Sequence, residues 1–216
     1  MEKQAQGLRA QGTGDGTAFS VWTSALVLSE YLAASHQLPA GPHVELGSGR
    51  GLCGLTLAKL GVDVSRPTTS PDLVYCTDGD PEVFSLITSA ATANGVDHVV
   101  QTATLEWGNR RQVDELLARL DGKPPSLMVG ADLLYDVEAI PALVDTLVRL
   151  GGLRTILAFP PRHLLPAVGA VGQSCRELDS LVQHAGRHGL CVERRQQHGD
   201  ILSSCVLIVE VLSEKS

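Results

Sequence analysis

Two polar residues with chemical potential follow a short apolar run near the middle of the chain. The run covers residues 126–131, and Asp132 and Tyr135 come directly after it. An apolar run of this length, bounded by polar residues, is typical of a buried strand. In a parallel sheet, ligands bind beyond the carboxyl ends of the strands, so this carboxylate and this phenol are expected at the mouth of a site. The alternative is that Asp132 caps the next helix and Tyr135 packs in the core.

A glycine-rich turn is the second candidate. Residues 43–46 form a short apolar run that contains Glu45 and precedes four glycines, Gly47, Gly49, Gly51 and Gly54. The apolar residues that follow are spaced as in a helix, which predicts a strand, a tight turn and a helix. Glycines allow close approach of the backbone to a ligand. The N–H groups at a helix start favour electron-rich ligand atoms, so the turn predicts a nucleotide-like cofactor.

The identity of that cofactor depends on other residues. The series Gly49-x-Gly51-x-x-Gly54 matches the dinucleotide fingerprint, so an NAD-dependent dehydrogenase is one alternative. Asp78 ends the next predicted strand, where it could accept hydrogen bonds from ribose hydroxyls in either cofactor class, or cap the helix that begins near Pro81. The sequence has no Tyr-x-x-x-Lys pair, which short-chain dehydrogenases use.

The elements that must position these residues alternate between strand and helix along the chain. Such alternation predicts an α/β fold with a doubly wound, mostly parallel sheet. The last two predicted strands, residues 191–194 and 204–212, are expected to form an antiparallel hairpin. We expect residues 1–17 to be a flexible arm, because they are polar and rich in glycine. Residues 18–216 are then one domain.

Composition limits the class of protein further. The 216 residues carry a net charge of −7 and are 44% hydrophobic, which suits a folded domain that does not bind nucleic acid through a basic surface. The five cysteines are scattered and form no CxxC pair, so we expect reduced thiols in the cytoplasm and no metal site. No apolar run is long enough to span a membrane.

Four motifs in order resemble the methyltransferase-16 family of seven-β-strand protein-lysine methyltransferases. They are the helix segment that begins Val21-Trp22, the turn Glu45-Leu46-Gly47-Ser48-Gly49, the pair Trp107-Gly108 and the strand exit Asp132-x-x-Tyr135. The residues around Leu134 to Val144 are most similar to the elongation factor 2 lysine methyltransferases. The resemblance implies a Rossmann-like seven-stranded sheet, S-adenosylmethionine as cofactor and a protein substrate, such as a translation factor, that presents a lysine.

The resemblance also implies a role for each residue that would contact the cofactor. The backbone of Gly47, Ser48 and Gly49 would line the methionine part, with Glu45 directed to its amino group. The backbone of Ala131 would close the pocket near the sulfonium.

Three further contacts complete the implied cofactor site. Asp78 would hold the ribose, Trp107 would lie near the adenine, and Trp22 would reach in from the leading helix. Without the resemblance, Trp22 would be assigned to the core.

Asp132 and Tyr135 are the implied catalytic residues. A lysine amine has an unperturbed pKa of about 10.4 and must lose its proton before it accepts a methyl group. Asp132 would orient the incoming ammonium, and Tyr135 would form the channel wall and align the nitrogen. Two alternatives remain: methylation of a small molecule or of another side chain such as histidine, and a non-catalytic subunit that binds the cofactor.

Overall fold

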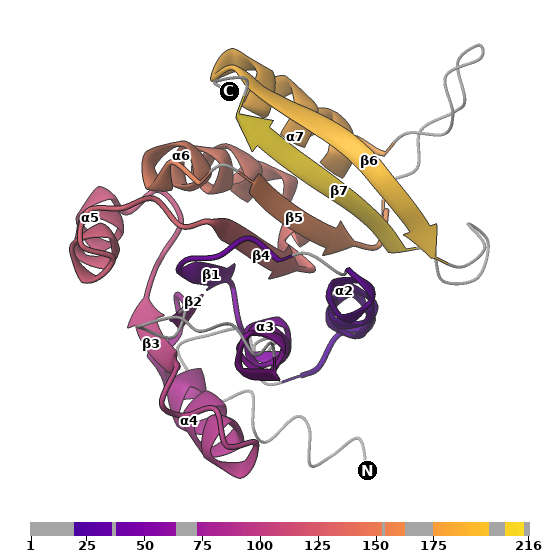
Figure 1. The fold of residues 1–216 in the computed structure, drawn as a ribbon. Coiled ribbons are helices and arrows are strands. Elements are labelled where there is room, and N and C mark those ends of the chain that lie inside the picture. The colour runs from indigo at the N-terminus through magenta and orange to yellow at the C-terminus, as the bar shows by residue number, and fades with distance from the viewer. Residues whose placement is uncertain are drawn as a thin grey trace, which may run out of the picture.

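The computed structural model describes residues 20–35, 38–63, 73–152, 154–162, 175–198 and 206–213 (Figure 1). Seven strands form one sheet: β1 His43–Leu46, β2 Val74–Asp78, β3 Val100–Thr104, β4 Leu127–Ala131, β5 Arg154–Phe159, β6 Leu190–His198 and β7 Val206–Ser213. The α-helices are α2 Thr23–Ala34, α3 Leu52–Asp63, α4 Phe84–Ala93, α5 Arg110–Arg119, α6 Ile140–Leu150 and α7 Arg176–Arg187. Short 3-10 turns lie at Pro81–Val83, Leu133–Tyr135 and Val137–Ala139.

The sheet has the strand order β3-β2-β1-β4-β5-β7-β6. Strands β1 to β5 pair in parallel, whereas β7 is antiparallel to both β5 and β6. The predicted fold class, with its C-terminal antiparallel hairpin, is confirmed. The chain runs outward from β1 through β2 to β3, then returns to the other side of β1 as β4. The carboxyl ends of β1 and β4 therefore form the switch point at which such sheets bind ligands.

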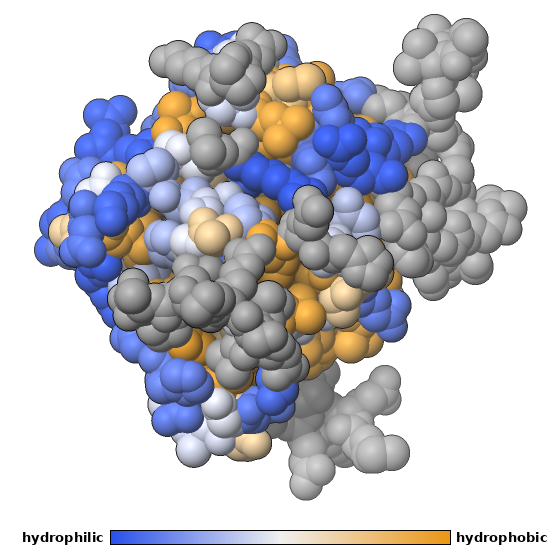
Figure 2. Space-filling view, in the orientation of Figure 1, coloured by the Kyte–Doolittle hydropathy of each residue, from blue (hydrophilic) through white to orange (hydrophobic). Residues whose placement is uncertain are grey.

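Helices cover both faces of the sheet (Figure 1). One hydrophobic core contains buried residues of α2, α3 and α4, such as Leu28, Leu57 and Ile87. The other contains residues of α5, α6 and α7, such as Leu116 and Leu143. Strands that are covered on both faces are buried along their length, and the four residues of β1 are all buried, including the polar His43 and Glu45. On the side shown in Figure 2, hydrophobic and hydrophilic described residues are interspersed.

Two helix starts differ from the expectation, and capping explains one of them. The spacing of apolar residues predicts a helix at 113–120. Helix α5 begins earlier, at Arg110, because the side chain of Asn109 accepts a hydrogen bond from the N–H of Gln112. The leading helix was expected from Val21 but begins at Thr23. Trp22 is its N-cap residue and has extended backbone angles. It therefore belongs to the segment that leads into the helix and not to the helix itself.

The closing hairpin is longer than expected. The strand predicted at 191–194 extends from Leu190 to His198, with an irregularity at Arg194/Gln196, and pairs along its length with β7. Polar residues are tolerated here because β6 is an edge strand. Glu210 on β7 is buried, and its carboxylate accepts hydrogen bonds from Arg154 at 2.5 Å and Arg195 at 3.0 Å. The two arginines hold the pKa of Glu210 below its usual value, although burial opposes them.

The flexible arm expected at 1–17 lies outside the described residues. In the described part of the chain, no helix is long and apolar enough to cross a membrane. The same residues contain no cluster of three or more His, Cys, Asp or Glu side chains suited to a metal ion. Cys53, Cys76, Cys175 and Cys191 are free thiols, and the first three are buried.

Candidate active site

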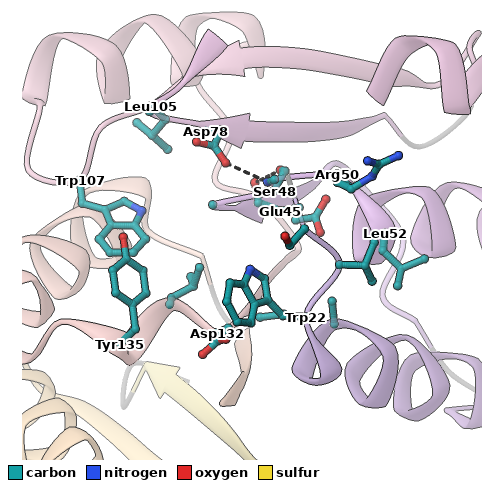
Figure 3. Close-up of a pocket in the computed structure, with 18 of the residues that line it drawn as sticks. Trp22, Glu45, Ser48, Arg50, Leu52, Asp78, Leu105, Trp107, Asp132 and Tyr135 are labelled. Carbon is teal, nitrogen blue, oxygen red and sulfur yellow. Dashed lines mark hydrogen bonds between the residues drawn. The ribbon is translucent and has the colours of Figure 1, made fainter. Parts of the chain in front are cut away.

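A cavity of about 510 Å³ opens at the carboxyl ends of β1, β2 and β4, at the switch point of the sheet (Figure 3). Small-molecule sites usually have volumes of about 300–1,000 Å³. Every residue that the sequence assigned to the site lines this cavity: Trp22, Glu45, Gly47, Ser48, Gly49, Asp78, Trp107, Ala131, Asp132 and Tyr135. Residues from five separate segments of the sequence are thus brought to one place.

The glycine turn after β1 requires glycine for steric reasons. Gly47, Gly49 and Gly51 have φ angles of 54°, 48° and 76°, a region that other residues rarely adopt. A Cβ atom on Gly47 would also lie 2.6 Å from Cδ2 of Leu133, the residue after Asp132. The turn can therefore approach the exit of β4 closely only without a side chain at Gly47.

The N–H groups of this turn are mostly engaged within the protein. Ser48 donates to the carbonyl of Thr77 at 2.8 Å, and Gly51 donates to the carbonyl of Ser48 at 2.6 Å. Gly49 donates to Oδ2 of Asp78 at 2.8 Å. These three N–H groups stabilise the conformation of the turn. A ligand would therefore contact the glycine backbone mainly through van der Waals packing and not through these three donors.

The side chain of Glu45 lies against the first turn of α3. Its side chain is buried, and Oε1 accepts a hydrogen bond from the N–H of Cys53 at 3.1 Å. A Cβ atom on Gly54 would lie 2.7 Å from Oε2, so the carboxyl also packs against this glycine. The prediction that open N–H groups of this helix face a ligand is therefore wrong at Cys53. The carboxyl of Glu45 is directed at the helix start, although the residue does line the cavity.

The burial of Glu45 has an electrostatic consequence. Removal from water penalises the charged carboxylate and raises its pKa from 4.5 to about 7, while the hydrogen bond from Cys53 opposes the shift. The same burial, together with the charge of Glu45, raises the pKa of the neighbouring thiols of Cys53 and Cys76 well above the usual value. Both cysteines are therefore kept as neutral thiols beneath the turn.

Asp78 links the glycine turn to the end of β2. Its Oδ2 accepts from Gly49, and its Oδ1 accepts from the N–H of Asp80 at 3.0 Å (Figure 3 shows the contact near Ser48). The 3-10 turn that follows is capped by Asp80, whose side chain accepts from the N–H of Glu82. The alternative in which Asp78 is the cap is therefore wrong, and Asp78 remains a predicted ribose ligand that lines the cavity.

Asp132 has a left-handed backbone, with φ of 61° and ψ of 32°. This conformation is uncommon for a residue other than glycine and often marks a functional site. The N–H of Asp132 donates to the carbonyl of Ala158 at 2.7 Å, which ties it to β5. The side chain is 7% exposed and makes no capping hydrogen bond. Its Oδ1 instead accepts from Nη2 of Arg162 at 2.8 Å, so the capping alternative is wrong here too.

Aromatic side chains surround the opening of the cavity. Trp22 is 42% exposed and Tyr135 is 49% exposed, so the alternatives that placed them in the core are wrong. Trp107 is partly buried against the core formed with α5, α6 and α7. Figure 3 shows all three rings around the cavity, with Trp22 next to Asp132 in the view.

Comparison with known proteins identifies the family of this chain. The family model described as lysine methyltransferase matches residues 2–162. The chain belongs to this family. The predicted membership is confirmed, and the predicted similarity to the elongation factor 2 enzymes within it stays a prediction.

Curated relatives agree with this membership. The chain is 29% identical over 188 residues to protein-lysine N-methyltransferase EFM3 of Chaetomium thermophilum, which covers 86% of this chain and 51% of the relative. It is 32% identical over 146 residues to protein N-lysine methyltransferase METTL21A of Danio rerio, covering 66% and 59% of the two chains. The chain thus spans about half the length of the curated relatives it matches.

A solved structure has the same fold. Magnesium protoporphyrin IX methyltransferase from Synechocystis PCC 6803, determined with bound SAM, matches with a TM-score of 0.62 and 17% identity. The match covers 99% of this chain and 98% of the other. At this level of identity the match supports the seven-stranded architecture alone.

Sequence reasoning assigned no role to three charged residues that line the cavity, Arg50, Glu106 and Arg162. Arg162 lines the cavity and pairs with Asp132. It lies after β5 and the Pro160-Pro161 pair, outside the motifs that identify the family. A usable signal existed: β5 is parallel to β4, so a basic residue just past β5 lies at the same edge of the sheet as Asp132.

Proposed function

We propose that this chain is an S-adenosylmethionine-dependent methyltransferase that acts on a lysine side chain of a protein. One observation carries the proposal: the buried carboxylate of Asp132 lines the same cavity as the glycine turn, whose Gly47 lies against Leu133. One end of the cavity thus suits a nucleotide-like cofactor, and the other suits a cationic acceptor. Family membership supports the same assignment.

The residues present fit such a cofactor. The bare backbone of Gly47 lines the cavity, and so does Asp78 at the end of the neighbouring strand. The backbone of residues 47–49 and Ala131 would hold the methionine part, Asp78 the ribose, and Trp107 the adenine. When bound, the cofactor supplies an electrophilic methyl group on a sulfonium.

The chain's own contribution is to bind and orient the amine. A lysine approaches mainly as an ammonium, because its unperturbed pKa is about 10.4. Trp22 and Tyr135 stand at the opening and would exclude water around the side chain, which lowers that pKa. Asp132 would direct the nitrogen toward the methyl group. Most of the acceleration would come from orientation, since an aligned pair of reactants can gain about 7–11 kcal/mol over free encounter.

A translation factor is the substrate class that we propose. The support is the resemblance of residues 134–144 to the elongation factor 2 lysine methyltransferases. We also propose the cytoplasm as the compartment, which would keep the described cysteines as the free thiols observed.

Isothermal titration followed by methyl transfer tests the proposed function. We expect the protein to bind S-adenosylhomocysteine and to transfer tritiated methyl groups from S-adenosylmethionine into protein of a cell extract. Hydrolysis of the labelled protein should return methylated lysine. Failure to bind S-adenosylhomocysteine would exclude the enzyme. Binding without transfer would indicate a non-catalytic subunit, and label only in small molecules would refute the protein substrate.

A further inference from the structure

An ion pair crosses the acceptor end of the cavity between two neighbouring strands. Asp132 follows β4 and Arg162 follows β5, and these strands are parallel neighbours. Nη2 of Arg162 donates to Oδ1 of Asp132 at 2.8 Å. The side chain of Asp132 is 7% exposed, whereas that of Arg162 is 32% exposed. The guanidinium therefore reaches from the rim onto a carboxylate that the fold holds in place.

The contact occupies one side of the carboxylate. Within the described part of the chain, no donor is paired with Oδ2 of Asp132, and the residue lines the cavity. Oδ2 is therefore the acceptor that a substrate amine could reach while the arginine stays in place. The cavity's other charged or titratable lining residues are Glu45, Arg50, Asp78, Glu106 and Tyr135. Arg162 is the basic lining residue whose ion pair with Asp132 the structure shows.

Asp132 alone would create a conflict for the proposed reaction. A buried carboxylate attracts an ammonium but also stabilises its charge, so the amine keeps the proton that it must lose. A fixed positive charge on the other carboxylate oxygen reduces that stabilisation. It does so without removing the oxygen that orients the nitrogen.

We propose that Arg162 is a positioning residue that offsets the charge of Asp132, so that the bound amine is oriented yet releases its proton to water. This inference rests on the proposed function. The lone pair of the neutral nitrogen would then form the new bond to the methyl carbon as the bond from that carbon to the sulfonium sulfur breaks. The products would be a neutral thioether and a methylated ammonium. Arg162 acts on the amine only through its charge and transfers no proton itself.

A cofactor analogue tests this proposal without a known substrate. In sinefungin a carbon replaces the sulfonium sulfur, and an amine on that carbon stands where the transferred methyl group would lie. The measurement is the ratio of sinefungin affinity to S-adenosylhomocysteine affinity by titration calorimetry at pH 7. We expect R162Q to raise this ratio about tenfold, because an uncompensated carboxylate within about 4–6 Å shifts the pKa of an amine by about one unit or more.

Three controls separate charge from structure. R162K keeps the positive charge and should restore the wild-type ratio. The double variant R162Q/D132N should lose the gain. R149Q breaks an arginine–aspartate pair of similar length, 2.9 Å to Asp114, whose exposed side chains do not line the cavity, and should leave the ratio unchanged.

The outcomes are distinct. An unchanged ratio in R162Q, with normal S-adenosylhomocysteine binding, would overturn the role of Arg162 and leave the proposed function intact. A parallel loss of both ligands would show that Arg162 only maintains the cavity. Once an acceptor is known, the pH–rate profile of R162Q should move to higher pH by about one unit with an unchanged or lower KM. A higher kcat at neutral pH would instead show that Arg162 blocks the acceptor site.

Discussion

The exits of β1 and β4 lie side by side at one edge of the sheet, yet they are built differently. Beyond β1, the left-handed positions are all glycines, and the N–H groups of Ser48, Gly49 and Gly51 are paired within the protein. Beyond β4, the left-handed position is Asp132, a residue that pays a steric cost for that conformation. Its carboxylate is paired with a residue from another strand.

The difference shows how two parts of one site can be encoded. The β1 exit is a backbone surface, so its chemistry depends on the absence of side chains along one continuous stretch. The β4 exit places one functional group, so it depends on the charge of Asp132 and on what the neighbouring strand supplies. We therefore expect substitutions at the β4 exit to change the rate of methyl transfer. Substitutions at the β1 exit should change the affinity for the cofactor and the stability of the fold.

The largest effect is expected from Asp132→Asn. Asparagine tolerates the left-handed backbone, so this variant removes the charge and keeps the conformation. We expect methyl transfer to fall at least about 100-fold, because loss of orientation alone can cost that much. Affinity for S-adenosylhomocysteine, measured by calorimetry, should stay close to the wild-type value.

Asp132→Ala is the matched comparison for that variant. It should lose the same activity and also destabilise the fold by about 1–2 kcal/mol, since alanine is strained at positive φ. An equal loss of cofactor affinity and activity in Asp132→Asn would contradict the division between the two exits.

The next effect concerns Glu45 and is a dependence on pH. The folded protein holds the proton of Glu45 up to about pH 7, whereas an unfolded chain releases it near 4.5. Its contribution to stability is therefore complete below pH 4.5 and is lost as the pH rises through 7. Between pH 5 and pH 7 the free energy of unfolding should fall by about 2 kcal/mol from this group.

Urea unfolding of the wild type and Glu45→Gln at both pH values measures that difference. The variant cannot ionise at residue 45, so its stability should change less with pH. Equal changes in the two proteins would show that the buried carboxyl is not protonated in the folded state.

A smaller effect is expected from Gly47→Ala, which tests the need for a bare backbone at the β1 exit. The added Cβ would require φ of 54° and would lie 2.6 Å from Leu133. We expect a destabilisation of about 1–2 kcal/mol and weaker binding of S-adenosylhomocysteine. Thermal unfolding and calorimetry measure the two.

Gly61→Ala in α3 is the control for that change. A Cβ atom on Gly61 would meet nothing within 4 Å, so alanine should stabilise the helix by up to about 1 kcal/mol. Similar losses in both variants would mean that the turn has no special requirement for glycine.

Local patterns predicted the fold well because strand and helix alternate with clear turn residues between them. Apolar runs located β1 to β5 within one or two residues. The errors lie where side chains act through tertiary contacts: Asn109 starts α5 early, and β6 extends through polar residues because β7 pairs with it. Apolar spacing contains neither kind of information.

The site was predictable to a different degree at each position. The cavity gathers all of the assigned residues, but the motifs could not show that Glu45 would turn toward Cys53. Arg162 was missed because it becomes a neighbour of Asp132 only through the pairing of β4 with β5. The direction of a side chain and the pairing of charges that follow neighbouring strands both depend on tertiary packing. Local sequence patterns do not predict that packing.

The cavity is assembled from the exits of strands β1 to β5 and from the chain that enters α2. These segments are far apart in the sequence, so the cavity forms only when the domain that contains them is folded. A ligand that binds there stabilises the native state alone, by about 2.7 kcal/mol when its concentration is 100 times its dissociation constant. The supply of cofactor would then raise the free energy of unfolding of this protein as well as support its turnover.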